Sequence, residues 1–224
     1  MVTIVGRPFR LRNVRFIAFL LLLSSSDLVL AGEIHEAVKN DDLAKVRSLI
    51  NNNPDLVFSK DEDGFTPLHL AAANGYKDMA EFLLANKADA NATDNSQSTP
   101  LHQAIAAVGE HVELLELLIT HKADVNAADT NGLTPLHYAA LADNGKAVKL
   151  LLARGAHPDV RDKVDGNTPL IIATGKGYKD VAEVLLANGA DVNAADKKGT
   201  PLAWAIHTGH PDIAKLLRQH GGHE

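Results

Sequence analysis

The tripeptide Thr-Pro-Leu occurs five times in this chain at a nearly constant interval. The copies begin at Thr66, Thr99, Thr134, Thr168 and Thr200, so successive starts are 33, 35, 34 and 32 residues apart. We number them copy one to copy five in this order. In a domain with one compact core, a short motif is not expected to recur at a fixed interval. In a stack of similar structural units it is, because each unit needs the same local sequence. The period therefore predicts a repeat solenoid.

Each copy predicts the same pair of helices. Its Thr suits a helix N-cap, and Pro suits the first helical position, where the missing N–H costs no hydrogen bond. Gly75 follows the first helix of copy one, where glycine most easily takes the left-handed conformation. A second helical stripe follows, formed in copy one by Met79, Phe82 and Leu83. Turn-favouring residues then lead to the next copy.

Copies one to three extend the tripeptide to Thr-Pro-Leu-His-x-Ala, with His69, His102 and His137 at the fourth position. This motif in units of about 33 residues resembles the ankyrin repeat. The resemblance covers the chain from about Glu33 onwards and implies an all-α solenoid of about six helix-turn-helix units, with extended loops or short β-hairpins. It also implies that the three histidines form structural hydrogen-bond bridges. Ile171 and Ala203 replace this histidine in copies four and five.

The repeat pattern divides the chain into two regions. We expect residues 1–31 to be a signal peptide and residues 32–224 to be the repeat domain. Both ends of a solenoid need units with one polar side. Within the domain we expect an N-terminal cap repeat at 32–62, four full repeats at 63–94, 95–129, 130–162 and 163–196, and a C-terminal cap repeat at 197–224.

The period also locates insertions and deletions. Copy two is two residues longer than copy one, and the surplus falls around residues 107–110, between its helices. Copy four gains one residue at Val164 or Asp165 in the loop that precedes its Thr-Pro-Leu, which we call its approach loop. Copy five loses one residue between Gly199 and Thr200. Changes of length in loops are tolerated on a protein surface.

Gln97 stands where the other approach loops carry glycine. A left-handed conformation at a residue with a side chain costs about 1 kcal/mol, unless Asn95 or Ser96 takes the turn instead. We therefore expect copy two to be the weakest repeat.

The N-terminal region does not share the repeat. Four arginines precede an unbroken apolar run from Phe16 to Leu23, and a small residue, Ala31, follows. This order is typical of a secretory signal peptide, and the run is shorter than the about 20 apolar residues that span a bilayer. We expect an exported, periplasmic or secreted protein of bacterial type, cut after Ala31, with a cut after Ser26 as the alternative. Two other interpretations stay open: an uncleaved interfacial anchor, and a cytoplasmic adaptor or effector with a misassigned start.

Cleavage after Ala31 would make the chain more acidic. It removes four Arg and one Asp, which leaves 18 basic and 27 acidic residues and moves the formal charge from −6 to −9. An acidic chain is a poor binder of nucleic acid, and 4% aromatic residues are too few for a base-stacking platform. We therefore expect no nucleic-acid partner.

We find no residue set that needs a catalytic, cofactor-binding or metal-binding explanation. The chain has no cysteine and no His-Glu-x-x-His motif. An alternative function, metal binding or hydrolysis, would use the histidines near the C-terminus: His207, His210, His220 and His223. A metal site needs convergent ligands with supporting contacts, and we expect His-Gly-Gly-His at the chain end to be flexible.

The leading hypothesis is a non-enzymatic, monomeric module that binds another protein and has no stable membrane span in its mature chain. In ankyrin-like proteins the binding face is concave and consists of loop tips and first helices. Phe65 and Leu133 are the apolar residues that we expect to anchor a partner there. By matching positions the face includes Glu62, Asp63, Phe65, Asn74, Asn95, Ser96, Asn131, Leu133, Arg161, Lys163, Lys197 and Lys198, acidic at the start of this series and basic at its end.

Overall fold

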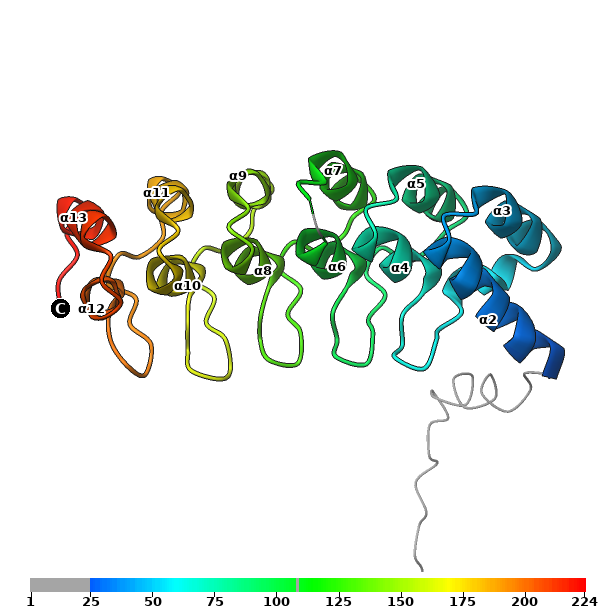
Figure 1. The fold of residues 1–224 in the computed structure, drawn as a ribbon, viewed down its shortest axis with the longest axis horizontal. Coiled ribbons are helices and arrows are strands. Elements are labelled where there is room, and N and C mark those ends of the chain that lie inside the picture. Colours follow the sequence, from blue (N-terminus) through cyan, green and yellow to red (C-terminus); the bar gives the residue numbers. More distant parts are fainter. Residues whose placement is uncertain (1–24, 108) are drawn as a thin grey trace, which may run out of the picture.

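The described part of the chain is a row of paired helices. The computed structural model describes residues 25–107 and 109–224, and these hold twelve α-helices, one short 3-10 helix and no assigned strand. Figure 1 shows the first helices of the pairs in one row, the second helices in a row beside them, and long loops on the far side of the first helices. The predicted all-α solenoid is confirmed.

The first helix of each pair begins, in copies one to five, at the proline of Thr-Pro-Leu. The first helices are α2 (Ser25–Lys39), α4 (Pro67–Ala73), α6 (Pro100–Ala106), α8 (Pro135–Leu141), α10 (Pro169–Lys176) and α12 (Pro201–His207). The second helices are α3 (Leu43–Asn52), α5 (Lys77–Ala85), α7 (Val112–Thr120), α9 (Gly145–Ala153), α11 (Lys179–Ala187) and α13 (Pro211–Gln219). The 3-10 helix η1 (Pro54–Phe58) follows α3.

The predicted start and stop signals are confirmed in atomic detail. The hydroxyl oxygen of Thr66 accepts a hydrogen bond from the backbone N–H of His69 at 3.4 Å, and that of Thr168 accepts from Ile171 at 3.3 Å. These bonds satisfy N–H groups that a helix start leaves without a partner. Gly75 follows α4 with φ +73°, in the left-handed region. The sequence thus determines where each short first helix begins and ends.

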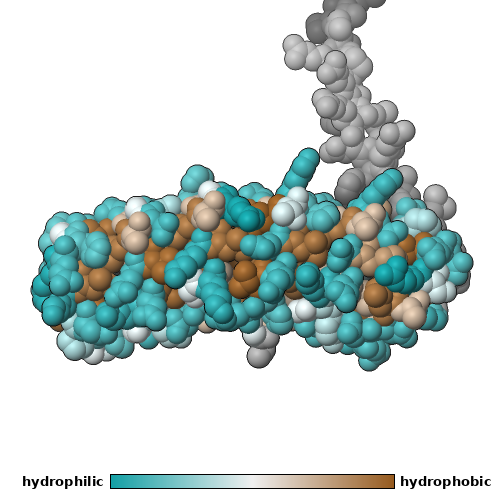
Figure 2. All heavy atoms as spheres, turned by 90° about the horizontal axis from the view of Figure 1, so that it is seen from above, coloured by the Kyte–Doolittle hydropathy of each residue, from teal (hydrophilic) through white to brown (hydrophobic). Residues whose placement is uncertain are grey.

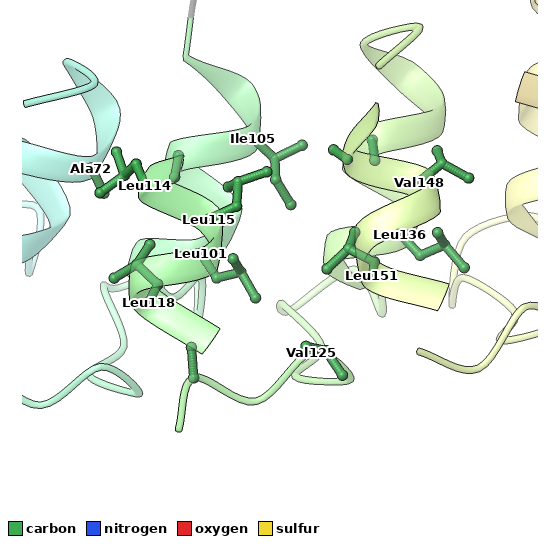
Figure 3. Close-up of a cluster of buried hydrophobic side chains, with 14 of the residues drawn as sticks. Ala72, Leu101, Ile105, Leu114, Leu115, Leu118, Val125, Leu136, Val148 and Leu151 are labelled. Carbon is green, nitrogen blue, oxygen red and sulfur yellow. The ribbon is translucent and has the colours of Figure 1, made fainter. Parts of the chain in front are cut away.

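The hydrophobic core lies between the helix pairs, so that each pair completes the core of its neighbours. Figure 3 shows Leu101, Leu115 and Leu118 of copy two in one buried cluster with residues of the adjoining copies, among them Ala72 and Leu136. All five are at most 1% exposed. Burial of a large aliphatic side chain contributes about 1.5–3 kcal/mol, and these residues obtain it only when the copies stack. Stability therefore comes from the contacts between repeats.

Asparagine side chains tie the turns after the second helices to one another. The Asn126 amide nitrogen donates to the carbonyl of Gly155 at 3.1 Å, and its oxygen accepts from the N–H of His157 at 2.9 Å. Asn91 and Asn193 form the same double bridge to the copy that follows each of them. The corresponding residue between copies three and four is Asp159, which only accepts, from the Asp191 N–H at 2.9 Å. A carboxylate has no hydrogen to donate, so this joint loses one of the two bonds.

The insertions and deletions lie where the period predicts. Five residues separate α6 from α7, whereas three separate α4 from α5. In the approach loop of copy four the N–H of Asp162 bonds to the carbonyl of Asn167, one residue further than in copy three. In copy five the N–H of Asp196 bonds to the carbonyl of Gly199, one residue nearer. The loops absorb each change in length and the helix pairs stay in register.

Gln97 itself takes the left-handed turn in the approach loop of copy two, with φ +61°. Asn95 and Ser96 are not among the residues with positive φ. The strain that the sequence predicts is therefore present at Gln97, while the relative stability of copy two stays a prediction.

Helix α2 of the N-terminal cap contains the expected cleavage site. Helix α2 begins at Ser25 and runs past Ala31, so a cut after Ala31 would fall within this helix and leave its second half, which carries the buried Ile34 and Val38. The basic and apolar parts of the expected signal peptide lie outside the described residues. No helix in the described ranges is both long and apolar enough to cross a membrane.

The side of the molecule formed by the second helices carries a narrow apolar band. Figure 2 shows this band running along the molecule between polar residues. On the second helices, half-buried residues such as Phe82, Leu117, Leu150 and Val184 pack against the core. The guanidinium of Arg47 lies 4.3 Å from the centre of the Phe82 ring and covers part of the band. The band is therefore the outer edge of the core.

One buried hydroxyl group in α10 has no hydrogen-bond partner among the described residues. Thr174 is 0% exposed and its Oγ1 has no partner, whereas the equally buried Thr168 uses its oxygen as an N-cap. An unsatisfied buried polar atom costs about 1–3 kcal/mol. The other copies carry alanine or isoleucine at the position of Thr174.

We expect Thr174→Val to stabilise the protein by about 1 kcal/mol, because it replaces the unpaired hydroxyl with a methyl group of similar size. The matched control, Thr168→Val, makes the same chemical change at a cap and should destabilise by about 1 kcal/mol. Urea unfolding followed by circular dichroism measures both. A loss of stability in Thr174→Val would show that its hydroxyl has a partner, such as a buried water.

Candidate protein-binding face

An aspartate organises each approach loop. One carboxylate oxygen of Asp129 accepts from the backbone N–H groups of Asn131 at 2.8 Å and Leu133 at 2.9 Å. Asp61, Asp94, Asp162 and Asp196 accept in the same way from N–H groups of their own loops. These bonds fold the loop into a tight turn, so the loop aspartates have the structural role that turn chemistry predicts.

Adjacent loop tips are joined by backbone hydrogen bonds. The N–H of Thr130 donates to the carbonyl of Ser96 at 2.9 Å, and the N–H of Lys163 donates to the carbonyl of Asn131 at 2.8 Å. Equivalent bonds join the tip of copy two to that of copy one and the tip of copy five to that of copy four. The five tips therefore form one continuous row (Figure 1). We call this row, together with the exposed side of the first helices, the loop face.

In copies two, three and five, the residue at the fifth position of the motif, directly after the histidine position, points from its first helix towards the aspartate of its own loop. The amide of Gln103 donates to Asp94 Oδ2 at 3.3 Å, the hydroxyl of Tyr138 to Asp129 Oδ2 at 3.1 Å, and the indole N–H of Trp204 to Asp196 Oδ2 at 2.9 Å. Partial burial raises the pKa of the Tyr138 hydroxyl, so it stays a donor near neutral pH. These side chains form a half-buried floor between helices and loops.

The twelve residues predicted for the binding face are distributed along this surface. Ten are exposed, and two, Phe65 and Leu133, are half-buried. The Phe65 ring packs against the core with its centre 5.7 Å from that of His69. Asn74 lies at the end of α4, where its amide donates to the carbonyl of Leu70 at 2.8 Å. The exposed residues are Glu62, Asp63, Asn74, Asn95, Ser96, Asn131, Arg161, Lys163, Lys197 and Lys198.

The basic loop residues of copies four and five contact the neighbouring loop. Arg161 donates to the carbonyl of Ala195, and Lys197 donates to the carbonyl of Val164. The ammonium of Lys198 lies 2.8 Å from a carboxylate oxygen of Asp165, and this ion pair raises the pKa of the lysine. All three contacts cross from one copy to the other. Sequence reasoning assigned these cations to a partner, but the structure also uses them between repeats.

Lys163 differs from these three residues. Its ammonium group has no hydrogen-bond or ion-pair partner among the described residues, and its carbon chain lies against Gly132, where an added Cβ would come within 2.9 Å of Lys163 Cγ. The loop of copy four is held by Asp162 instead. Burial works against the charge of Asp162, but hydrogen bonds from Asn167 and from backbone N–H groups hold its pKa below the usual range. Lys163 is thus a free cation on a rigid loop.

The motif histidines bridge successive copies as predicted. In copy one, His69 Nδ1 accepts from the N–H of Thr66 at 3.1 Å, so Nε2 carries the proton and donates to the carbonyl of Ser98 at 3.1 Å. His102 and His137 repeat this geometry with the carbonyls of Leu133 and Asn167. Each ring therefore joins a first helix to the approach loop of the next copy.

Sequence reasoning missed a fourth bridge in the N-terminal cap. His35 is 3% exposed, and its Nε2 lies 2.9 Å from the carbonyl of Phe65, which is the position equivalent to Ser98. Its Nδ1 lies 2.5 Å from the carbonyl of Ala31. The signal was present, because residues 34–37 read Ile-His-Glu-Ala and match Leu-His-x-Ala. The absence of Thr-Pro before it hid the match.

The histidines near the C-terminus are spread over separate contacts. The His210 ring lies over Gly177, where an added Cβ would come within 2.6 Å of its Cε1, and His220 Nδ1 lies 3.0 Å from the carbonyl of Leu216. The backbone of His223 is held by Asn193 and by the Thr200 hydroxyl at 2.8 Å. The expected flexible chain end is therefore bonded to the repeat before it. In the described ranges no three His, Cys, Asp or Glu residues are placed to hold a metal ion.

Comparison with known proteins agrees with this architecture. The family described as ankyrin repeats matches three overlapping stretches, residues 34–129, 91–162 and 142–224. The chain belongs to the ankyrin repeat family. Ankyrin repeats are general protein–protein interaction modules, and no residue set in the described part of the chain demands a catalytic role.

Similar proteins include large and small members of this family. The chain is 32% identical over 207 residues to the neurogenic locus notch homolog protein 1 of Danio rerio, which covers 92% of this chain and 7% of that protein. It is 33% identical over 197 residues to the probable 26S proteasome regulatory subunit p28 of Saccharomyces cerevisiae, covering 85% of this chain and 86% of that protein. The chain therefore spans less than a tenth of the Notch proteins that it matches and most of the yeast subunit.

The buried histidine bridges predict a loss of stability in acid. Burial lowers the pKa of His69, His102 and His137 below the ordinary value of 6.5, against the opposing effect of their backbone hydrogen bonds. The unfolded chain therefore binds protons more readily than the folded one. The contribution of these histidines to the free energy of unfolding is fully present above about pH 6.5. It falls as the pH drops from there towards their lower folded pKa values.

Urea unfolding at about pH 7.5 and about pH 5.5 tests this expectation. The parent protein should lose stability at the lower pH. His137→Ile copies the natural residue at position 171, and it should be less stable at pH 7.5 but lose less stability on acidification. An equal loss in the parent and the variant would contradict a neutral, buried imidazole at His137.

Proposed function

We propose that this protein is a non-enzymatic interaction module that binds another protein on its loop face. The observation that supports the proposal is that structural roles and sequence variation fall on different residues of each repeat. The motif residues are used in caps, bridges and turns, whereas the loop tips carry side chains that differ from copy to copy on one rigid row. A scaffold of this kind fixes the positions of variable side chains and so permits specific recognition.

The relatives support the same class of function. The yeast protein is named as a probable regulatory subunit of the proteasome, a role carried out within an assembly of proteins. The matched region of the Notch proteins is a small part of each. By analogy we propose that the present chain contributes binding to a larger protein system, with its specificity set by its own loop tips.

Photocrosslinking at defined positions tests the face. A photoreactive amino acid replaces Asn95, Asn131 or Lys163 on the loop face in three separate variants, and in matched controls it replaces the exposed Glu81, Glu113 or Lys149 on the second helices. We expect one partner protein to crosslink from the loop positions and not from the second helices. Crosslinks from the second helices alone, or from neither side, would overturn the proposal.

We also propose that the protein is exported and acts outside the cytoplasm. The support is the order of basic, apolar and small residues in the first 31 positions. N-terminal sequencing of the native protein should find a mature chain that begins at Gly32, or at Asp27 if the cut follows Ser26. A native chain that begins at Met1 would rule out cleavage and favour an anchor or a cytoplasmic protein.

A further inference from the structure

The two halves of the loop face differ in charge. The tip of copy one carries three neighbouring carboxylates, from Asp61 to Asp63, whereas the tips of copies four and five carry the cations Arg161, Lys163, Lys197 and Lys198. Lys176 adds an exposed cation in the last turn of α10. This basic half is unusual in a chain whose formal charge is −6.

Few carboxylates neutralise the basic half. Asp162 and Asp196 lie nearby, but their oxygens accept hydrogen bonds from their own loops and from Asn167 and Trp204. Among the described residues Lys198 alone of these cations forms an ion pair, with Asp165. Lys163 and Lys176 keep exposed charges that are available to a ligand.

On its first helices the same half is the more apolar part of the loop face. Leu141 is 40% exposed and Val164 is 58% exposed, while Ile172 and Trp204 are half-buried. At the helix position of Leu141 the N-terminal half has Ala73 and Ala106. At the position of Ile172 and Trp204 it has Leu70 and Gln103. Among these four residues of the N-terminal half only Leu70 is large and apolar, and it is just 8% exposed. Exposed apolar area and unpaired positive charge therefore occur together in copies three to five.

A glycine leaves room on this surface. Gly175 occupies the position of Ala73, Ala106 and Leu141, and an added Cβ there would meet a single atom within 4 Å, Trp204 Cε3 at 3.7 Å. The surface of α10 beside the indole is thus open. The ammonium of Lys198 lies 5.8 Å from the centre of the same ring. Ile172, Gly175 and Trp204 together form a shallow apolar surface, and Lys198 lies at its edge.

We propose that this C-terminal half of the loop face binds an extended segment of a partner protein that carries large apolar side chains next to aspartates or glutamates. The apolar side chains would cover Ile172, Gly175 and Trp204, where burial of apolar area provides affinity. The carboxylates would meet Lys163 and Lys176, which adds specificity and speeds association. The inference rests on the proposed function and names the class of partner.

A phage-displayed library of random dodecapeptides, selected on the full chain, tests this proposal. We expect the enriched peptides to combine aspartate or glutamate with leucine, phenylalanine or tryptophan. The binding of one synthetic enriched peptide is then measured by fluorescence anisotropy, and an all-acidic peptide of equal length serves as a comparison. Equal affinity for the two peptides would show that charge alone is recognised and would overturn the apolar part of the inference.

Three variants locate the peptide. Lys163→Glu with Lys176→Glu should weaken binding by about tenfold or more, because it reverses both free charges. Lys149→Glu with Lys215→Glu makes the same change on exposed positions of the second helices and should leave affinity unchanged. Gly175→Gln should abolish binding by covering the surface formed by Ile172, Gly175 and Trp204, while raising the melting temperature, since glutamine is a better helix former than glycine. Its loss of binding cannot then be attributed to unfolding.

The outcomes separate the two proposals. The inference is overturned if no peptide is enriched or if the enriched peptides are basic. It is also overturned if Glu62→Lys with Asp63→Lys loses binding and Lys163→Glu with Lys176→Glu does not. In each of these cases protein binding on the loop face still stands. If the controls on the second helices lose affinity instead, both the inference and the proposed function fail.

Discussion

The solenoid depends on a short chain of hydrogen bonds that runs through each motif histidine. The Thr66 backbone N–H fixes the tautomer of His69, and the other ring nitrogen then reaches the carbonyl of Ser98 in the next approach loop. A ring that bonds at both ends inside a closed core fixes the separation of the two copies. That separation sets the spacing of the loop tips, so the geometry of the loop face follows from a bond in the core.

The carboxylates of the approach loops extend this order to the surface. Asp129 folds its loop through two backbone N–H groups and also holds Tyr138 of the first helix through its second oxygen. The loop and the helix thereby become one rigid unit. Rigid loops pay little conformational entropy when a partner binds, so the residues at their tips can vary and still be presented in a defined geometry.

Much of this architecture could be predicted from the sequence because each part depends on local chemistry. The period, the threonine N-caps of the first helices and the left-handed turn at Gln97 follow from single residues and their spacing, and the structure confirms them. His35 escaped prediction because its cap repeat lacks Thr-Pro, although its function in the stack is the same.

The face residues were harder to predict, because their roles depend on contacts between distant loops. The sequence shows that Arg161, Lys197 and Lys198 are basic but not that each reaches across to the neighbouring copy. Phe65 illustrates the same limit, since a ring at a loop position can turn inward. Its exposure depends on the packing of His69 beside it.

The position of these basic contacts has a physical reason. The joint between copies four and five is the one where Ile171 stands in place of the bridging histidine, and there the Gly199 carbonyl keeps only its bond from Asp196. Arg161, Lys197 and Lys198 all cross this joint on the exposed loops. A buried neutral bridge is replaced by charged surface contacts, which water and salt weaken.

The copies that supply the most positive charge to the loop face are therefore also those whose loops depend most on that charge. A bound carboxylate would compete with the contacts that hold these loops together. Lys163 and Lys176 avoid this conflict because neither side chain joins the loops, and for this reason they are the cations best placed to meet a partner.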